Sequence, residues 1–232
     1  MVRITWLGHS SFQLQLESGE VFLLDPWIEG NPKYPAGHSH SRVDAILVSH
    51  GHFDHIASAA GLAKKFSAKV IGIYEVCMFL KARGAENILP MNKGGSQQVG
   101  PVKVTMTQAL HSSGVEDESG NLVYAGEPAG YVLHFPDGRR CYFAGDTAVF
   151  SDMQLIRELY HPELAFLPIG DLFTMGPEQA ALAVRLLQPK KVIPMHWGTF
   201  PPLTGRPDQL AARIEGSGCD VWTLEPGKTS DW

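Results

Sequence analysis

Three histidines and an aspartate lie within six consecutive positions, His50-Gly51-His52-Phe53-Asp54-His55. They follow the apolar run 45–48, which is short and rich in Ile, Leu and Val and so predicts a buried strand. Neutral imidazole is the commonest metal ligand, and zinc, iron, nickel and manganese sites accept His together with Asp. The alternative is a polar loop without a ligand, but desolvated donors beside a buried strand need a common partner. The pattern therefore predicts a metal site, and the lack of a nearby cysteine argues against a closed structural zinc site.

Three more donors, His111, Asp146 and His196, end apolar runs in the same way. Open α/β sheets place their chemistry at the carboxyl ends of their strands, so these side chains converge if the runs share a sheet edge. One tetrahedral ion cannot take all the donors, whereas two ions sharing Asp146 can. The predicted metal ligands are therefore His50, His52, Asp54, His55, His111, Asp146 and His196.

The remaining histidines differ in their surroundings. His134 lies inside a predicted strand and His161 ends a predicted helix, so both are interpreted as structural. His38 and His40 repeat the H-x-H spacing without an adjacent strand or carboxylate, which favours a loop near the pocket. His9 follows a strand and a glycine and is a candidate substrate contact.

The elements that must position these residues follow from apolar periodicity and turn signals. Residues 2–7, 12–16 and 21–24 predict an antiparallel meander. Further strands are predicted at 45–48, 69–73, 97–99, 102–107, 130–135, 139–144, 164–168, 191–195 and 220–224, the last of which finishes the chain. Helices are predicted over about 55–66, 74–83, 151–160, 177–187 and 208–215. Residues 26–42 and 112–129 are predicted loops, the second long enough to form an active-site rim. No linker interrupts this order, so residues 1–232 are drawn as a single domain.

Composition restricts the class of protein. The chain has 232 residues, of which 44% are hydrophobic, and this is enough for one large core. A net charge of −5 without a basic run disfavours nucleic acid as a partner. Cys77, Cys141 and Cys219 form no C-x-x-C pair, which favours reduced thiols in a cytoplasmic protein. Neither a secretion signal nor a run near the roughly 20 apolar residues of a membrane span is evident, so a soluble protein without a membrane partner is expected.

The order His50-x-His52-x-Asp54-His55, His111, Asp146, His196 resembles the metallo-β-lactamase superfamily. The resemblance is closest to metal-dependent hydrolases related to the L-ascorbate-6-phosphate lactonases. It rests on the stretches at 6–10 (WLGHS), 109–113 (ALHSS), 126–130 (GEPAG), 144–147 (AGDT), 173–177 (FTMGP) and 195–197 (MHW). It implies an α+β or α/β fold, the four-layer αββα sandwich, with a binuclear metal centre at one edge.

The same resemblance divides the ligands between two metals. It assigns His50, His52 and His111 to one ion, Asp54, His55 and His196 to the other, and Asp146 to a bridge between them. Asp25 resembles an aspartate that orients a ligating histidine from outside the metal's own ligand shell. Phe53 stands where relatives often carry glycine, and Trp197-Gly198 replaces a more polar pair, which predicts a more apolar pocket. Zinc is the first choice for two divalent ions, and manganese, iron or nickel accept the same ligands.

Hydrolysis of a small ester, lactone or phosphoester is the expected reaction. Two cations about 3.5–4 Å apart can share one water and lower its pKa from 15.7 towards about 7, and the bridging hydroxide then attacks a carbonyl or phosphoryl centre. Asp54 is the expected catalytic residue, a ligand that also takes the proton as general base. Asp171 and Thr174, after the strand 164–168, join His9 as candidate contacts to a small-molecule substrate.

Three other functions fit the same ligands. Phosphodiesterase or nuclease action is one, and the acidic balance of the chain counts against it. A di-iron redox role is the second, but it normally needs an electron-delivering domain. The third is a non-catalytic metal-binding sensor or scaffold, which has no need of an open dinuclear centre. Homo-oligomer formation is left open, because the lactonase relatives assemble.

Overall fold

The computed structural model describes all residues from Met1 to Trp232, and they group into two compact units. Unit 1 comprises Met1–Lys93, Ser112–Ala129 and Leu224–Trp232, and unit 2 comprises Gly94–His111 and Gly130–Thr223. The chain passes from one unit to the other several times, so neither unit is a continuous segment. The single domain over residues 1–232 stays a prediction.

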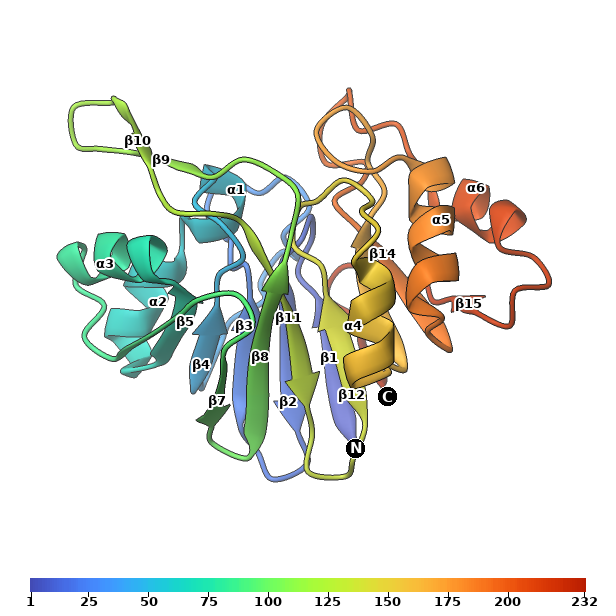
Figure 1. Cartoon of the computed structure of the whole chain (residues 1–232). Coiled ribbons are helices and arrows are strands. Elements are labelled where there is room, and N and C mark those ends of the chain that lie inside the picture. The colour runs from blue at the N-terminus through green and yellow to red at the C-terminus, as the bar shows by residue number, and fades with distance from the viewer. The chain divides into compact units, whose positions relative to one another are not determined.

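Unit 1 contains a seven-stranded mixed sheet (Figure 1). Its strand order is β16 (Thr229–Asp231), β1 (Val2–Trp6), β2 (Phe12–Leu16), β3 (Val21–Leu24), β4 (Ala45–Leu47), β5 (Lys69–Ile73) and β6 (Ile88–Met91). Strands β1 to β3 form the predicted antiparallel meander, whereas β3 to β6 are parallel. The carboxyl ends of β3 and β4 therefore adjoin, which brings Asp25 beside Ser49.

The helices of unit 1 are α1 (Phe53–Ile56), α2 (Ala59–Phe66) and α3 (Tyr74–Ala82). The prediction of one helix over about 55–66 is wrong, because the helix begins at Phe53 and is interrupted after Ile56. Ser58 explains the interruption. Its amide donates to the Pro26 carbonyl at 3.1 Å, and its hydroxyl accepts the Ile28 amide at 2.8 Å. These bonds to the 26–28 loop replace the bond that a continuous helix would make at Ser58.

The predicted loop 112–129 contains a β-hairpin made of β9 (Gly114–Glu116) and β10 (Leu122–Tyr124). In Figure 1 this hairpin extends away from the seven-stranded sheet of unit 1. Its turn is closed by the Asp117 carboxylate, which accepts the amides of Ser119 and Asn121 at 2.8 Å each. These strands were not predicted because each has only three residues, too few to show a clear periodicity, and polar turn residues separate them.

Two other strands were also missed. The segment 88–91, for which no strand was predicted, is the edge strand β6, where Pro90 is tolerated because an edge strand has no partner for the missing amide. The strand at 220 ends at Val221 rather than at 224, as β15, and it does not finish the chain. The last strand is β16, whose Ser230 pairs with Ile4 of β1.

Unit 2 contains a second seven-stranded sheet and the helices α4 (Met153–Tyr160), α5 (Pro177–Leu187) and α6 (Pro207–Arg213). Its strand order is β15 (Asp220–Val221), β14 (Lys191–Met195), β13 (Leu164–Pro168), β12 (Arg140–Phe143), β11 (Ala129–His134), β8 (Val102–Gln108) and β7 (Ser96–Val99). Strands β12 to β15 are parallel, and Tyr142, Phe143 and Phe166 are fully buried on them. Their carboxyl ends lie at one edge, where Asp146 and His196 follow. Across the chain, no helix combines the length and apolar character needed to cross a membrane.

Candidate metal centre

A buried aspartate organises the motif of unit 1. Asp25 follows β3 with a left-handed backbone, φ 43°, and its side chain is fully buried. One carboxylate oxygen, Oδ1, accepts the Ser49 amide at 2.7 Å. The other, Oδ2, accepts the Ser49 hydroxyl at 2.6 Å and His55 Nδ1 at 2.8 Å. Burial raises the pKa of the Asp25 carboxyl, and the neighbouring His55 and Ser49 oppose that shift.

These hydrogen bonds fix the tautomers of two histidines. Ser49 Oγ donates its one proton to Asp25, so it can only accept from His50 Nδ1, which lies 2.9 Å away. His55 Nδ1 donates directly to Asp25. We infer from these partners that Nε2 is the unprotonated nitrogen of both His50 and His55. A neutral imidazole with its lone pair on Nε2 can bind a metal ion through that nitrogen.

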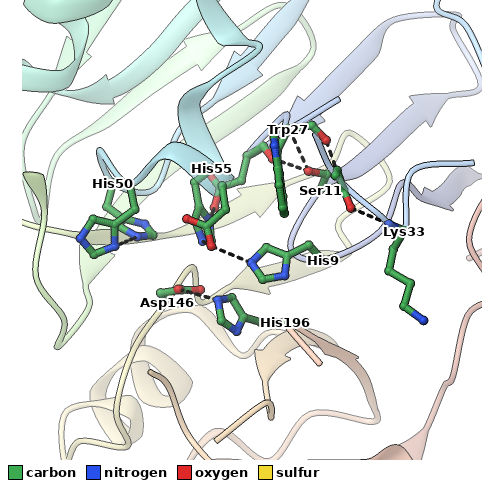
Figure 2. Close-up of polar contacts among 12 residues, drawn as sticks. His9, Ser11, Trp27, Lys33, His50, His55, Asp146 and His196 are labelled. Atoms are coloured by element: carbon green, nitrogen blue, oxygen red, sulfur yellow. Dashed lines mark hydrogen bonds and ion pairs between the residues drawn. The ribbon is translucent and has the colours of Figure 1, made fainter. Parts of the chain in front are cut away.

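The side chains of the motif lie close enough to share ions. His50 Nε2 is 2.9 Å from His52 Nδ1, and His55 Nε2 is 3.9 Å from Asp54 Oδ2. Ligand atoms of Asp25, His50 and His55 also lie within 4.8 Å of one another. Figure 2 shows the His50, His55 and His9 rings side by side. Neutral imidazoles and a carboxylate at these separations fit a divalent cation such as zinc.

His9, a predicted substrate contact, lies against Asp54. It is fully buried, its backbone φ is 55°, and Trp6 Nε1 donates to its carbonyl at 2.9 Å. His9 Nε2 lies 2.9 Å from Asp54 Oδ2. In this structure His9 is therefore placed to orient the Asp54 carboxylate, and its contact with a substrate stays a prediction.

Three predicted ligands form a cluster in unit 2. Nε2 of His196 lies 3.0 Å from Asp146 Oδ2, and Nε2 of His111 lies 3.8 Å from the same oxygen. The Asp146–His196 contact is drawn in Figure 2. A carboxylate approached by two imidazoles in this way can bind a cation together with them.

Main-chain contacts bring the strand ends of unit 2 together. Thr147 Oγ1 accepts the Leu110 amide at 2.9 Å, and the Ala148 amide donates to the Leu110 carbonyl at 2.9 Å. These two bonds join the segment before His111 to the segment after Asp146. His196 has a left-handed φ of 56°, and Gly170 allows the His196 carbonyl an approach that a side chain at position 170 would block.

Asp171 and Thr174 lie in the loop after β13. Asp171 is exposed, with φ 69°, and its carboxylate accepts the Leu172 amide at 2.9 Å. Thr174 Oγ1 donates to the Met175 carbonyl at 3.4 Å. Both contacts are local to the loop, and the substrate-binding role of the two residues stays a prediction.

Sequence reasoning missed two residues that orient the ligands. Ser49 immediately precedes His50, and Thr147 immediately follows Asp146. Each is a short hydroxyl side chain next to a predicted ligand at a strand end, and this position is the signal that could have identified them.

Residues 21–197 match the model of the beta-lactamase superfamily domain, a range that includes all the predicted ligands. The chain belongs to the beta-lactamase superfamily. It is 62% identical over 231 residues to a UPF0173 metal-dependent hydrolase of Solibacter usitatus, covering 100% of both chains. It is 50% identical to another from Koribacter versatilis, covering 98% of this chain and 97% of the relative. At the level of the family, the predicted metal-dependent hydrolase is confirmed.

A solved structure confirms the predicted fold. Igni18, described as a novel metallo hydrolase from the hyperthermophilic archaeon Ignicoccus hospitalis, superposes with a TM-score of 0.86 at 34% identity. The match covers 100% of this chain and 99% of Igni18. The chain therefore has the metallo-β-lactamase fold, and each of its units supplies one sheet with accompanying helices.

Proposed function

We propose that the clusters of unit 1 and unit 2 jointly hold two divalent metal ions, with zinc as the first choice, and that the chain hydrolyses a small ester, lactone or phosphoester. In this proposal His50, His52 and His111 take one ion, Asp54, His55 and His196 take the other, and Asp146 bridges them. The observation that carries it is the network of Asp25 and Ser49, which presents the Nε2 lone pairs of His50 and His55.

The donor set supports a catalytic centre rather than a closed structural site. Its members are imidazoles and carboxylates without a thiolate, and structural zinc sites are usually rich in cysteine. Two ions bound there would supply Lewis acidity and a water of lowered pKa. The chain's own contribution is to fix the ligands beforehand through the buried Asp25.

Asp54 is the proposed general base. Its side chain is 14% exposed, so its carboxylate is reachable from solvent while still bounded by protein. His9 Nε2 contacts Oδ2 at 2.9 Å and fixes the direction of that oxygen. The carboxylate can therefore take a proton from an attacking water and release it later to the leaving group.

An exposed aromatic side chain within the motif supports an organic substrate. Phe53 is 64% exposed, and its ring packs edge-on against Trp27 with centroids 5.6 Å apart. Trp27 in turn packs edge-on against His9 at 5.4 Å. This aromatic row begins beside Asp54 and favours a substrate with an apolar group over a fully charged one.

A metal-dependence experiment tests the proposal. Purified protein is treated with a chelator, then resupplied separately with Zn²⁺, Mn²⁺, Fe²⁺ or Ni²⁺, and screened with chromogenic esters, lactones and bis-phosphodiesters. We expect activity on an ester, lactone or phosphoester that the chelator abolishes and one metal restores. Turnover of bis-phosphodiesters alone would instead favour a phosphodiesterase. Stoichiometric metal binding without turnover of any of these substrates would favour a sensor or scaffold.

We also propose that the protein works in the cytoplasm. Cys77, Cys141 and Cys219 are all unbridged and buried. Reduced, unpaired thiols are typical of a reducing compartment.

A further inference from the structure

The motif loop of unit 1 is bonded to the base of the β9–β10 hairpin. The Gly51 amide donates to Ser113 Oγ at 3.1 Å, and that hydroxyl donates to the Ala125 carbonyl at 3.3 Å. The Ala125 amide donates back to the Ser113 carbonyl at 3.4 Å. A single hydroxyl thus joins the main chain of the motif to both ends of the hairpin segment.

Packing at Gly51 tightens the same junction. A Cβ at position 51 would lie 2.8 Å from Val115 Cγ1, 2.9 Å from Ala125 Cβ and 3.0 Å from the Gly114 carbonyl. The hairpin base therefore rests directly on the Gly51 main chain, and only glycine fits there without a shift. One residue before the motif, the Ser49 carbonyl accepts the Ala129 amide at 2.9 Å. The segment 112–129 is therefore hydrogen-bonded to the main chain at both Ser49 and Gly51.

The two imidazoles that flank Gly51 depend differently on this junction. His50 is also oriented from its own ring, through Nδ1 and Ser49. His52 is partly exposed, and the Ser112 hydroxyl lies 3.5 Å from its Nε2, at the limit of a hydrogen bond. His52 also contacts His50 directly, through its Nδ1 at 2.9 Å from His50 Nε2, and the Gly51 main chain between the two residues sets the positions from which the rings meet.

We propose that Ser113 is a positioning residue, which holds the Gly51 main chain and so aligns His50 and His52 on one metal ion. This inference rests on the proposed function, because it takes His50 and His52 to be metal ligands. The β9–β10 hairpin therefore has a role in the proposed site. The segment that was expected to form an active-site rim also supports the main chain that carries the metal ligands.

The first measurement uses the full-length apoprotein and needs no metal. Amide hydrogen exchange is followed by NMR in the ¹⁵N-labelled wild-type chain and in the Ser113→Ala, Ser113→Thr and Ser119→Ala variants. Loss of the acceptor should speed exchange of the Gly51 amide about tenfold in Ser113→Ala. Ser113→Thr keeps the hydroxyl and should restore most of the protection. Ser119→Ala, at the exposed turn of the same hairpin, is the matched control and should leave Gly51 unchanged.

The second measurement is the affinity for Zn²⁺, determined by competition with a chromophoric chelator. Residues that hold a metal ligand in place without contacting the metal typically contribute about 10–100-fold to metal affinity. In Ser113→Ala we expect one of two ions to bind at least about tenfold more weakly, at the low end of that range, and the other to bind as in the wild type. Gly51→Ala should weaken the same ion, and the thermal unfolding of each variant shows whether it is folded.

The outcomes separate the two proposals. A Gly51 amide that exchanges at the wild-type rate in Ser113→Ala would overturn the inference, as would unchanged zinc affinity despite faster exchange. A wild-type chain that binds no divalent ion would overturn the proposed function and this inference with it. That result is distinct, because it is seen before any variant is made.

Discussion

In unit 1, His50 and His55 are oriented through their own rings, by hydrogen bonds that lead to the buried carboxylate of Asp25. In unit 2, by contrast, the contacts that align His111 with Asp146 are made by the main chain around Leu110 and by the hydroxyl of Thr147. The contacts in unit 1 also determine which ring nitrogen of each histidine carries the proton. The contacts in unit 2 mainly determine where the donors lie. We infer that unit 1 prepares the ligand nitrogens chemically and that unit 2 places its donors by joining strand ends.

The two units share one backbone feature at these sites. His9 and Asp25 in unit 1 and His196 in unit 2 all have left-handed φ angles, between 43° and 56°. Such a conformation costs about 1–3 kcal/mol in a residue other than glycine and persists only where the surroundings enforce it. Both units therefore use strained positions within three residues of a strand end to direct a side chain.

The largest effect should come from Asp54→Asn, which removes the proposed base from unit 1. General-base catalysis typically contributes 10²–10⁴-fold, so kcat should fall by about that factor. Steady-state kinetics on the substrate found in the screen measures it. Asp152→Asn, on an exposed residue before α4, is the matched control. Near-normal turnover by Asp54→Asn would contradict the role given to Asp54.

Asp25→Asn should be next in size, because it affects both histidines of the unit 1 network. An amide NH₂ in this position faces hydrogen-bond donors from Ser49 and His55, and a buried unsatisfied group costs about 1–3 kcal/mol. We expect both ions to bind about 10–100-fold more weakly. Zinc titration and chemical unfolding measure the two quantities. Wild-type zinc affinity in this variant would show that the tautomers do not depend on Asp25.

Thr147→Val tests the hydrogen bond that joins two strand ends in unit 2. Valine keeps the shape of threonine but leaves the Leu110 amide without its acceptor, which should lower the free energy of unfolding by about 1–3 kcal/mol. The separation of His111 and Asp146 should also change, and we expect zinc affinity to fall. Thr174→Val is a suitable control, since the Thr174 hydroxyl makes only a local contact. A fully stable Thr147→Val variant with unchanged zinc affinity would contradict the comparison.

Ser49→Ala should have the smallest effect of the four. It removes the link between Asp25 and His50 but leaves the bond between Asp25 and His55. Only the affinity for the ion assigned to His50 should fall, by about tenfold. Equal weakening of both ions would mean that the network acts as a unit rather than through separate bonds. Two-site zinc titration distinguishes these results.

Much of the fold could be predicted because apolar periodicity dominates it. The strands Phe12–Leu16, Val21–Leu24, Lys69–Ile73, Leu164–Pro168 and Lys191–Met195 have the predicted bounds. The errors occur where tertiary contacts determine the structure. Bonds from Ser58 to the 26–28 loop interrupt a helix, and pairing with β1 creates β16 from a segment without an apolar pattern.

The candidate site divides in a similar way. The types and spacing of the ligands could be read directly, since few other arrangements explain three histidines and a carboxylate in six positions. Of the residues that orient the ligands, Asp25 was predicted through the family resemblance, whereas the hydroxyl residues were not. Ser49, Ser113 and Thr147 are ordinary hydroxyl residues in the sequence, and their importance depends on which main-chain amide or ring nitrogen folding brings to each.

The central proposal is that two ions are bound, with Asp146 as a ligand of both. Crystals grown with Zn²⁺ and measured at the zinc absorption edge test it directly through the anomalous difference map. We predict two peaks about 3.5–4 Å apart, with Asp146 contacting both. A single peak, or two ions each held by the donors of one unit alone, would contradict it.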